Sequence, residues 1–250
     1  MSWKDHQQNL AVVAVWATYS ICTLLALGFL HHSPYLLSDF NFAFLHGFLD
    51  HFDSIPSYFR WDSIWYYAMA RDGYWGDLAS SAKTAAFYPL YPFLIRGVTE
   101  ILRVDLFVAG LIVSLIFLLL FLWVFDRYLR YCGNFSKTRS LMTLFIFLLL
   151  PSSYLCVTYY HVSLFLFLSL ASLYCYQRNK LGWAFVWSFF LGLTHMHAIT
   201  LALGFLALGI FKKEKRAYLM TLFTLGGTLL LAIHHLYFFG DALYYIRAKA

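Results

Sequence analysis

The sequence predicts an all-α, polytopic membrane protein, and three properties of the chain support this fold class. First, 62% of its 250 residues are hydrophobic and only 12% are charged, whereas soluble domains are about half apolar and about a quarter charged. Second, the mean hydropathy is +0.67, so the few polar groups cannot cover the apolar surface in water. Third, the apolar residues form long runs, and the first, residues 10–30, is long enough to span a bilayer. We expect residues 1–250 to form a single transmembrane domain.

These apolar runs define the expected elements in chain order. They cover residues 10–30, 104–125, 141–176, 181–211 and 218–239. The first, second and fifth have the length of one membrane crossing each. The third and fourth are too long for one helix and short for two, and polar residues interrupt them at 151–161 and 194–197. We predict a pair of short helices for each, meeting near one membrane face, because polar groups at membrane depth persist only inside protein or beside a wet cavity.

The basic residues predict the orientation of the chain. With the N-terminus in the cytosol, 11 of the 18 basic residues fall in four short cytosolic segments, as the positive-inside rule requires. These segments are 1–9, 126–140, 177–180 and 212–217. Both interrupted regions and nine of the twelve acidic residues then lie on the non-cytosolic face. The net charge of +6 therefore reflects orientation, and we expect no nucleic-acid partner.

The segment 31–103 is the largest on the non-cytosolic face, and it holds the candidate site. Its aromatic residues suit the headgroup layer, so we expect amphipathic helices lying along the membrane surface. In RWDSIWYYAMARDGYWG, residues 60–76, Asp62 or Ser63 can cap a helix over 63–72 that ends at Gly73. In FYPLYPFLIR, which follows, two prolines are expected to limit helix formation before each of them.

Taken together, these two stretches resemble the signature of the GPI mannosyltransferase 2 family and its bacterial relatives, within the GT-C glycosyltransferase superfamily. The matching positions are Arg60, Trp61, Asp62, Trp65, Tyr66, Ala70, Gly73, Tyr74, Pro89, Leu90, Tyr91, Pro92 and Arg96. Weaker similarity continues through PSSY at 151–154, SLF at 163–165 and FGDALYYIRAKA at 239–250. The resemblance implies a GT-C-like transmembrane helix bundle with a large first outer loop. Because the family is longer, it also implies a chain truncated at its C-terminus.

The function implied by this resemblance is sugar transfer on the non-cytosolic face. The donor is a polyprenyl-phosphate sugar, with mannose favoured, and the acceptor is a hydroxyl of a lipid, a glycan or a protein. In enzymes of this kind an acidic residue of the first outer loop is the base, and Asp62 is the matching position. The chemistry independently needs such a group, because a hydroxyl is a weak nucleophile until a carboxylate takes its proton. We favour a bacterial inner membrane over an endoplasmic reticulum membrane.

The other expected site residues supply cations or hydrogen-bond donors for the leaving phosphate, or aromatic faces for the sugar and the lipid carrier. The expected substrate-binding residues are Arg60, Trp61, Trp65, Tyr66, Arg71, Tyr91, Arg96, His161 and His195. We expect membrane lipids as further partners and no cofactor. The histidine pairs at 46 and 51, 195 and 197, and 234 and 235 are each incomplete for a closed metal site, so no metal is expected.

Alternatives remain open at this stage. Asp62 can be a helix cap without chemistry, and the arginines can reach lipid headgroups only. Val162 stands where the family often has an acidic residue, and His195 where it often has arginine. The alternative function is therefore a catalytically inactive relative or a non-enzymatic membrane protein such as a transporter. A transporter is expected to have facing charges at mid-membrane and an internal repeat, and the sequence displays neither.

Overall fold

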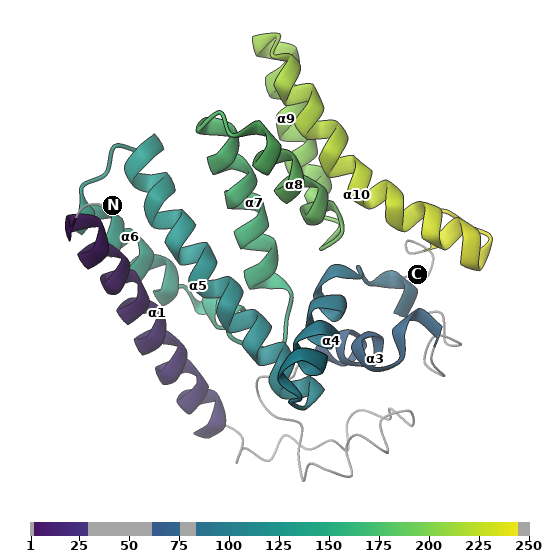
Figure 1. Ribbon diagram of the computed structural model, residues 1–250, viewed down its shortest axis with the longest axis horizontal. Coiled ribbons are helices and arrows are strands. Elements are labelled where there is room, and N and C mark those ends of the chain that lie inside the picture. The colour runs from purple at the N-terminus through teal and green to yellow at the C-terminus, as the bar shows by residue number, and fades with distance from the viewer. Residues whose placement is uncertain (1–2, 30–61, 76–83, 245–250) are drawn as a thin grey trace.

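The structure is a computed structural model that describes residues 3–29, 62–75 and 84–244. Within these ranges the chain is helical and has no strand (Figure 1), which confirms the predicted all-α class for this part of the protein. The helices are α1 (Trp3–Phe29), α3 (Ser63–Asp72), α4 (Leu90–Leu102), α5 (Leu106–Cys132), α6 (Lys137–Leu149), α7 (Val162–Gln177), α8 (Leu181–Gly192), α9 (Ala198–Lys212) and α10 (Lys215–Phe239). Short 3₁₀ turns are η4 (Gly73–Trp75), η6 (Thr84–Ala86) and η7 (Pro151–Cys156). Of the expected outer segment 31–103, residues 31–61 and 76–83 lie outside the described residues.

Three of these helices are long and apolar enough to cross a membrane. They are α5, α10 and the part of α1 from His6 to Leu27. With 27 residues, α5 measures about 40 Å at 1.5 Å per residue, more than the roughly 30 Å of a hydrocarbon core. The apolar helices α7, α8 and α9 are shorter, with 16, 12 and 15 residues. Length and composition are therefore compatible with a membrane protein.

The two interrupted apolar runs each form a pair of short helices, as predicted. The third run separates into α6, η7 and α7, and its break ends with the turn residues 157–161. The fourth separates into α8 and α9, with a turn over 193–197. Figure 1 shows the N-terminus and the α5–α6, α7–α8 and α9–α10 turns at one end of the helices, and α3 and α4 at the other. Most of the basic residues therefore lie at the end opposite α3 and α4.

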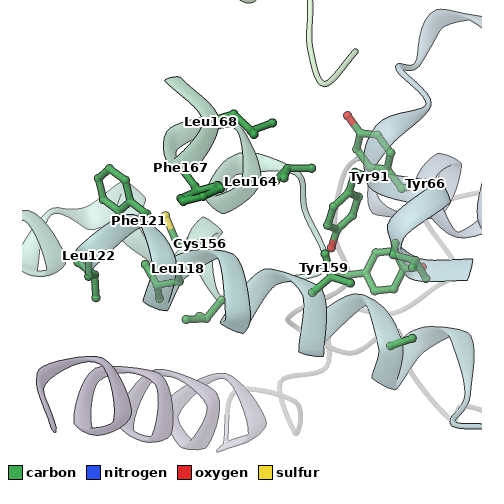
Figure 2. Close-up of a cluster of buried hydrophobic side chains, with 14 of the residues drawn as sticks. Tyr66, Tyr91, Leu118, Phe121, Leu122, Cys156, Tyr159, Leu164, Phe167 and Leu168 are labelled. Carbon is green, nitrogen blue, oxygen red and sulfur yellow. The ribbon is translucent and has the colours of Figure 1, made fainter. Parts of the chain in front are cut away.

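The long helix α5 is the centre of the packing. It contacts α1, α4, α6 and α7, while α8 packs on α7 and α10, and α9 packs on α10. Leu118 and Leu122 of α5 and Leu164 and Leu168 of α7 are almost fully buried in this core. Figure 2 shows that these leucines occupy one part of the core and that tyrosines gather in the other part, toward α3. The core thus changes from aliphatic to tyrosine-rich along α5.

Helices α8 and α10 approach each other through glycines. A methyl group on Gly192 would overlap the carbonyl oxygen of Thr224, and one on Gly227 would overlap that of Phe189. Close backbone approach through small residues is the usual packing mode of apolar helices in membranes, where burial alone provides little driving force. These two glycines therefore fix the α8–α10 contact.

A buried carboxylate joins α1, α5 and α6 at the end that carries the basic segments. Asp126 is fully buried, and its Oδ1 accepts hydrogen bonds from Gln8 Nε2 at 2.8 Å and from Ser140 Oγ at 2.7 Å. Its Oδ2 is 2.7 Å from a guanidinium nitrogen of Arg130. Because every partner satisfies part of the buried charge, this network holds the three helices together.

One sequence expectation about α4 is wrong. Pro92 was expected to limit helix formation before it, yet α4 begins at Leu90 and contains Pro92 in its first turn. Amides of the first helical turn have no intrahelical acceptor, so a missing N–H there costs nothing. Pro89 immediately precedes the helix, in agreement with a structural role for this proline.

Candidate functional site

Helix α3 forms where the sequence predicted it. It begins at Ser63 and ends at Asp72, and Gly73 then takes a φ of 72°, a conformation that favours glycine. Six of its ten residues are buried, against α4 and α5. Helix α3 therefore packs against protein over most of its surface, and its position along the membrane surface stays a prediction.

Asp62 immediately precedes α3 but does not cap it. Its backbone is helical, with φ −71° and ψ −3°, and its side chain makes no capping hydrogen bond. Instead, Asp62 Oδ2 accepts a hydrogen bond from the hydroxyl of Tyr160, at 2.9 Å. The carboxylate is half-buried. Its side chain is therefore directed to the break between α6 and α7, so the capping alternative is not the one that the geometry supports.

Two further hydrogen bonds join this break to α3. Ser63 Oγ donates to the carbonyl oxygen of Tyr159 at 2.7 Å, and the hydroxyl of Tyr66 lies 2.8 Å from Nδ1 of His161. Three consecutive residues of the break thus contact the first two turns of α3 and the residue before it. We call this group the Asp62 cluster, and its members are Asp62, Ser63, Tyr66, Tyr159, Tyr160 and His161.

Helices α4 and α5 contact the Asp62 cluster through Tyr91, Gly110 and Ser114. The hydroxyl of Tyr91 donates to the carbonyl oxygen of Gly110 at 3.1 Å and lies 2.8 Å from Ser114 Oγ. Ser114 Oγ also donates to the carbonyl oxygen of Tyr160 at 3.2 Å. The ring of Tyr159 covers Gly110 so closely that a methyl group there would overlap it. The backbone of the break is therefore fixed from α5 as well as from α3.

Stacked histidines connect the two breaks. The rings of His161 and His195 are 4.6 Å apart with an interplanar angle of 10°, and those of His195 and His197 are 4.6 Å apart at 6°. His195 Nδ1 and His197 Nδ1 lie 2.7 Å apart, a hydrogen bond that requires a proton on one of them. These three rings therefore form one continuous row from the break before α7 to the turn before α9.

Five of the expected substrate-binding residues come together around Asp62. Besides Tyr66, Tyr91, His161 and His195, the half-buried Trp65 stacks on Phe87 with ring centroids 6.1 Å apart and an interplanar angle of 19°. Trp65 and Phe87 therefore form a stacked aromatic pair about one helical turn from Asp62.

Two of the expected arginines lie away from Asp62, and two other expected substrate-binding residues lie outside the described part of the chain. Arg71 is exposed and forms an ion pair with Asp72, about 12 Å along α3 from Ser63 at 1.5 Å per residue. Arg96 is exposed and pairs with Glu100 on α4 at 3.1 Å. Arg60 and Trp61 lie outside the described residues, as do His46 and His51.

Burial keeps the cluster tyrosines protonated. It raises the pKa of Tyr66 well above the usual range, and the neighbouring Tyr160 and Asp62 raise it further. Burial also raises the pKa of Tyr160, as do the negative charge of Asp62 and the hydrogen bond between the two side chains. At neutral pH Tyr160 is therefore a hydrogen-bond donor and Asp62 its acceptor.

Sequence reasoning missed Ser63, Tyr159 and Tyr160 of the Asp62 cluster, and His197 beside it. The stretch TYYH at 158–161 was recognised as polar, but only His161 was selected from it. Nothing about a tyrosine in an apolar run marks it as the partner of a carboxylate 98 residues away.

No protein-family description, curated protein or solved structure matches this chain. What the protein does is therefore argued from the Asp62 cluster and the sequence pattern around it.

Proposed function

We propose that the protein is a membrane glycosyltransferase of GT-C type, with Asp62 as its general base. It moves a sugar, for which mannose is favoured, from a polyprenyl-phosphate carrier to an acceptor hydroxyl on the non-cytosolic face. The observation that supports this most is the state of the Asp62 carboxylate. Oδ2 accepts from Tyr160, while within the part of the chain that the structure describes Oδ1 has no hydrogen-bond partner. A half-buried carboxylate with one oxygen held and the other available is suited to accept a proton from a bound hydroxyl.

The transfer proceeds as a direct displacement with inversion. The acceptor hydroxyl loses its proton to Asp62, and its oxygen forms a bond to the anomeric carbon. The bond from that carbon to the phosphate oxygen breaks at the same time, and the electron pair leaves with the lipid phosphate. Each sugar transferred therefore yields one glycosylated acceptor, one lipid phosphate and one proton, which Asp62 later releases to solvent.

The leaving phosphate gains negative charge and needs donors nearby. His195 is half-buried, His197 is exposed, and both present imidazole nitrogens beside the cluster. Helices α7 and α9 begin after His161 and His197, and the N-terminus of a helix favours an anion. These groups take the role that the resemblance gives to arginine at the position of His195. Trp65 and Phe87 provide an aromatic face for the sugar or the prenyl chain.

The membrane arrangement is part of the proposal. With α1, α5 and α10 as crossings, the α5–α6, α7–α8 and α9–α10 turns face the cytosol with the basic residues, and the Asp62 cluster faces the opposite side. A bacterial inner membrane is the favoured location. The donor and a lipid, glycan or protein acceptor then reach the cluster from the outer leaflet or the non-cytosolic compartment.

The test is sugar transfer by membranes that contain the full-length protein, supplied with labelled polyprenyl-phosphate mannose. Asp62→Asn keeps the size of the side chain but removes the base, and transfer is expected to fall by roughly 10²–10⁴-fold, the usual contribution of a general base. Glu100→Gln is the matched control, since it makes the same chemical change at an exposed position of α4. Glu100→Gln is expected to transfer at the rate of the unchanged protein.

Two results would count against the proposal. Undiminished transfer in Asp62→Asn would remove Asp62 from the chemistry. No transfer from any polyprenyl-phosphate sugar by the unchanged protein would favour the alternative, a catalytically inactive relative or a non-enzymatic membrane protein.

A further inference from the structure

Tyr160 is the side chain that contacts the proposed base, and it is held in place from several directions. Its hydroxyl lies 2.9 Å from Asp62 Oδ2, and its carbonyl oxygen accepts from Ser114 of α5. The residues on either side of it are fixed to α3, Tyr159 through Ser63 and His161 through Tyr66. The position of the hydroxyl is therefore set by the fold and not by Asp62 alone.

Without Tyr160, the Asp62 side chain has an obvious competing arrangement. An aspartate before a helix ordinarily turns back to accept a hydrogen bond from an amide of the first helical turn. Asp62 occupies this position but makes no such bond. A carboxylate that capped α3 would have one oxygen engaged with the backbone and would be turned away from the break. The helical backbone of Asp62 also differs from the extended conformation of a capping residue, so the backbone and the hydrogen bond from Tyr160 together direct the carboxylate away from the cap.

We propose that Tyr160 is the positioning residue of Asp62: its hydroxyl holds Oδ2, keeps the carboxylate turned away from the helix cap, and leaves Oδ1 available for the acceptor hydroxyl. The inference rests on the proposed function of Asp62 as the base. Tyr160 does not take the substrate proton itself. A charge-assisted hydrogen bond of this kind is stronger than one between neutral groups.

Other titratable groups surround the pair, and their contributions must be separated from that of Tyr160. Tyr66 of α3 lies near the carboxylate, Tyr91 of α4 packs on Tyr66, His161 packs on Tyr160, and His195 stacks on His161. All of these side chains remain in place in Tyr160→Phe, because the ring that packs on Tyr66 is kept. The variant therefore removes one hydroxyl and no packing.

The experiment measures Asp62 directly, without relying on transfer. Hydrophobic carbodiimides react with protonated carboxyl groups. The full-length protein is labelled in membranes across a pH series, and the label on Asp62 is measured by peptide mass spectrometry. The extent of labelling therefore follows the protonation of Asp62. In Tyr160→Phe, labelling of Asp62 at a given pH is expected to rise several-fold, because Oδ2 loses the hydroxyl that holds it. Tyr128→Phe is the matched control, because it removes the same hydroxyl group near the C-terminal end of α5, away from the Asp62 cluster. In Tyr128→Phe the labelling curve of Asp62 is expected to match that of the unchanged protein.

Transfer provides the second measurement. Tyr160→Phe is expected to lower kcat by roughly 10-fold with little change in KM. An unchanged labelling curve in Tyr160→Phe overturns the inference, whatever the activity. A shifted curve combined with no transfer by the unchanged protein supports the contact and overturns the proposed function, so the two failures are distinguishable.

Discussion

Gly110→Ala is the substitution that most directly tests how α5 supports the site. Gly110 lies in the second turn of α5, against the ring of Tyr159, and a methyl group there would overlap three atoms of that ring. Figure 2 shows Tyr159 lying against α5. Because Tyr159 is fully buried and its carbonyl oxygen accepts from Ser63, the ring cannot move without displacing the break.

Two opposing effects set the change that Gly110→Ala makes in the free energy of unfolding. Alanine in place of glycine within a helix stabilises by about 1 kcal/mol, while overpacking a filled core typically destabilises by about 1–3 kcal/mol. Because the methyl group would overlap three ring atoms of the buried Tyr159, the upper part of the overpacking range applies, and we expect a net loss of roughly 1–2 kcal/mol. For a protein of this size about 1 kcal/mol corresponds to roughly 2–4 °C in Tm, so Gly110→Ala is expected to lower the Tm by roughly 2–8 °C.

The assay is thermal unfolding of the detergent-purified protein, with Gly97→Ala as the control. Gly97 is a helical position of α4 at which a methyl group would meet nothing within 4 Å, so this substitution is expected to raise the Tm slightly. In a Tyr159→Leu background the penalty of Gly110→Ala is expected to disappear, because the ring it overlaps is gone. The reasoning is refuted if Gly110→Ala unfolds at or above the temperature of the unchanged protein, or if its penalty is the same in both backgrounds.

The remaining predictions concern the helix contacts and pH. Asp126→Ala leaves the guanidinium of Arg130 without its carboxylate, so a loss of about 3 kcal/mol is expected by denaturant unfolding, the size typical of breaking a buried ion pair; a loss below about 1 kcal/mol would contradict the buried network. Gly227→Leu forces α10 away from α8 and is expected to lower the Tm by several degrees, whereas an unchanged Tm would mean that the helices do not meet there. Because burial raises the pKa of Tyr66 and Tyr160 above that of an unfolded tyrosine, near 10, their contribution to stability is fully present below about pH 10. It is lost as the pH rises further, since the unfolded chain then binds fewer protons; tyrosinate absorbance that titrates fully near pH 10 in the folded protein would contradict this.

Local sequence signals were sufficient for several elements. The helix 63–72 was predicted from residues that favour a helix start and from Gly73, and its conformation at φ 72° is one that few other residues adopt. The break before α7 was predicted from Pro151 and the polar residues after it, because such residues do not continue an apolar helix. In both cases the decisive interactions lie within a few residues along the chain.

Contacts between distant residues could not be predicted in the same way. The hydrogen bond from Tyr160 to Asp62 and the cover of Gly110 by Tyr159 depend on how α3, α5 and the break pack together, and neither tyrosine carries a local sign of this role. The helix-cap interpretation of Asp62 failed for the same reason, since a partner from another part of the chain competes with the local amides. Arg96 was selected by position and sign of charge, but a neighbouring acid one turn along α4 pairs with it.

The central claim is that Asp62 is the base of a sugar transfer from a lipid phosphate. The measurement that tests it most directly is the ratio of initial transfer rates from labelled polyprenyl-phosphate mannose, Asp62→Asn against Glu100→Gln, at equal protein levels in membranes. The account predicts a ratio of roughly 10⁻² or lower, and a ratio near one would contradict it.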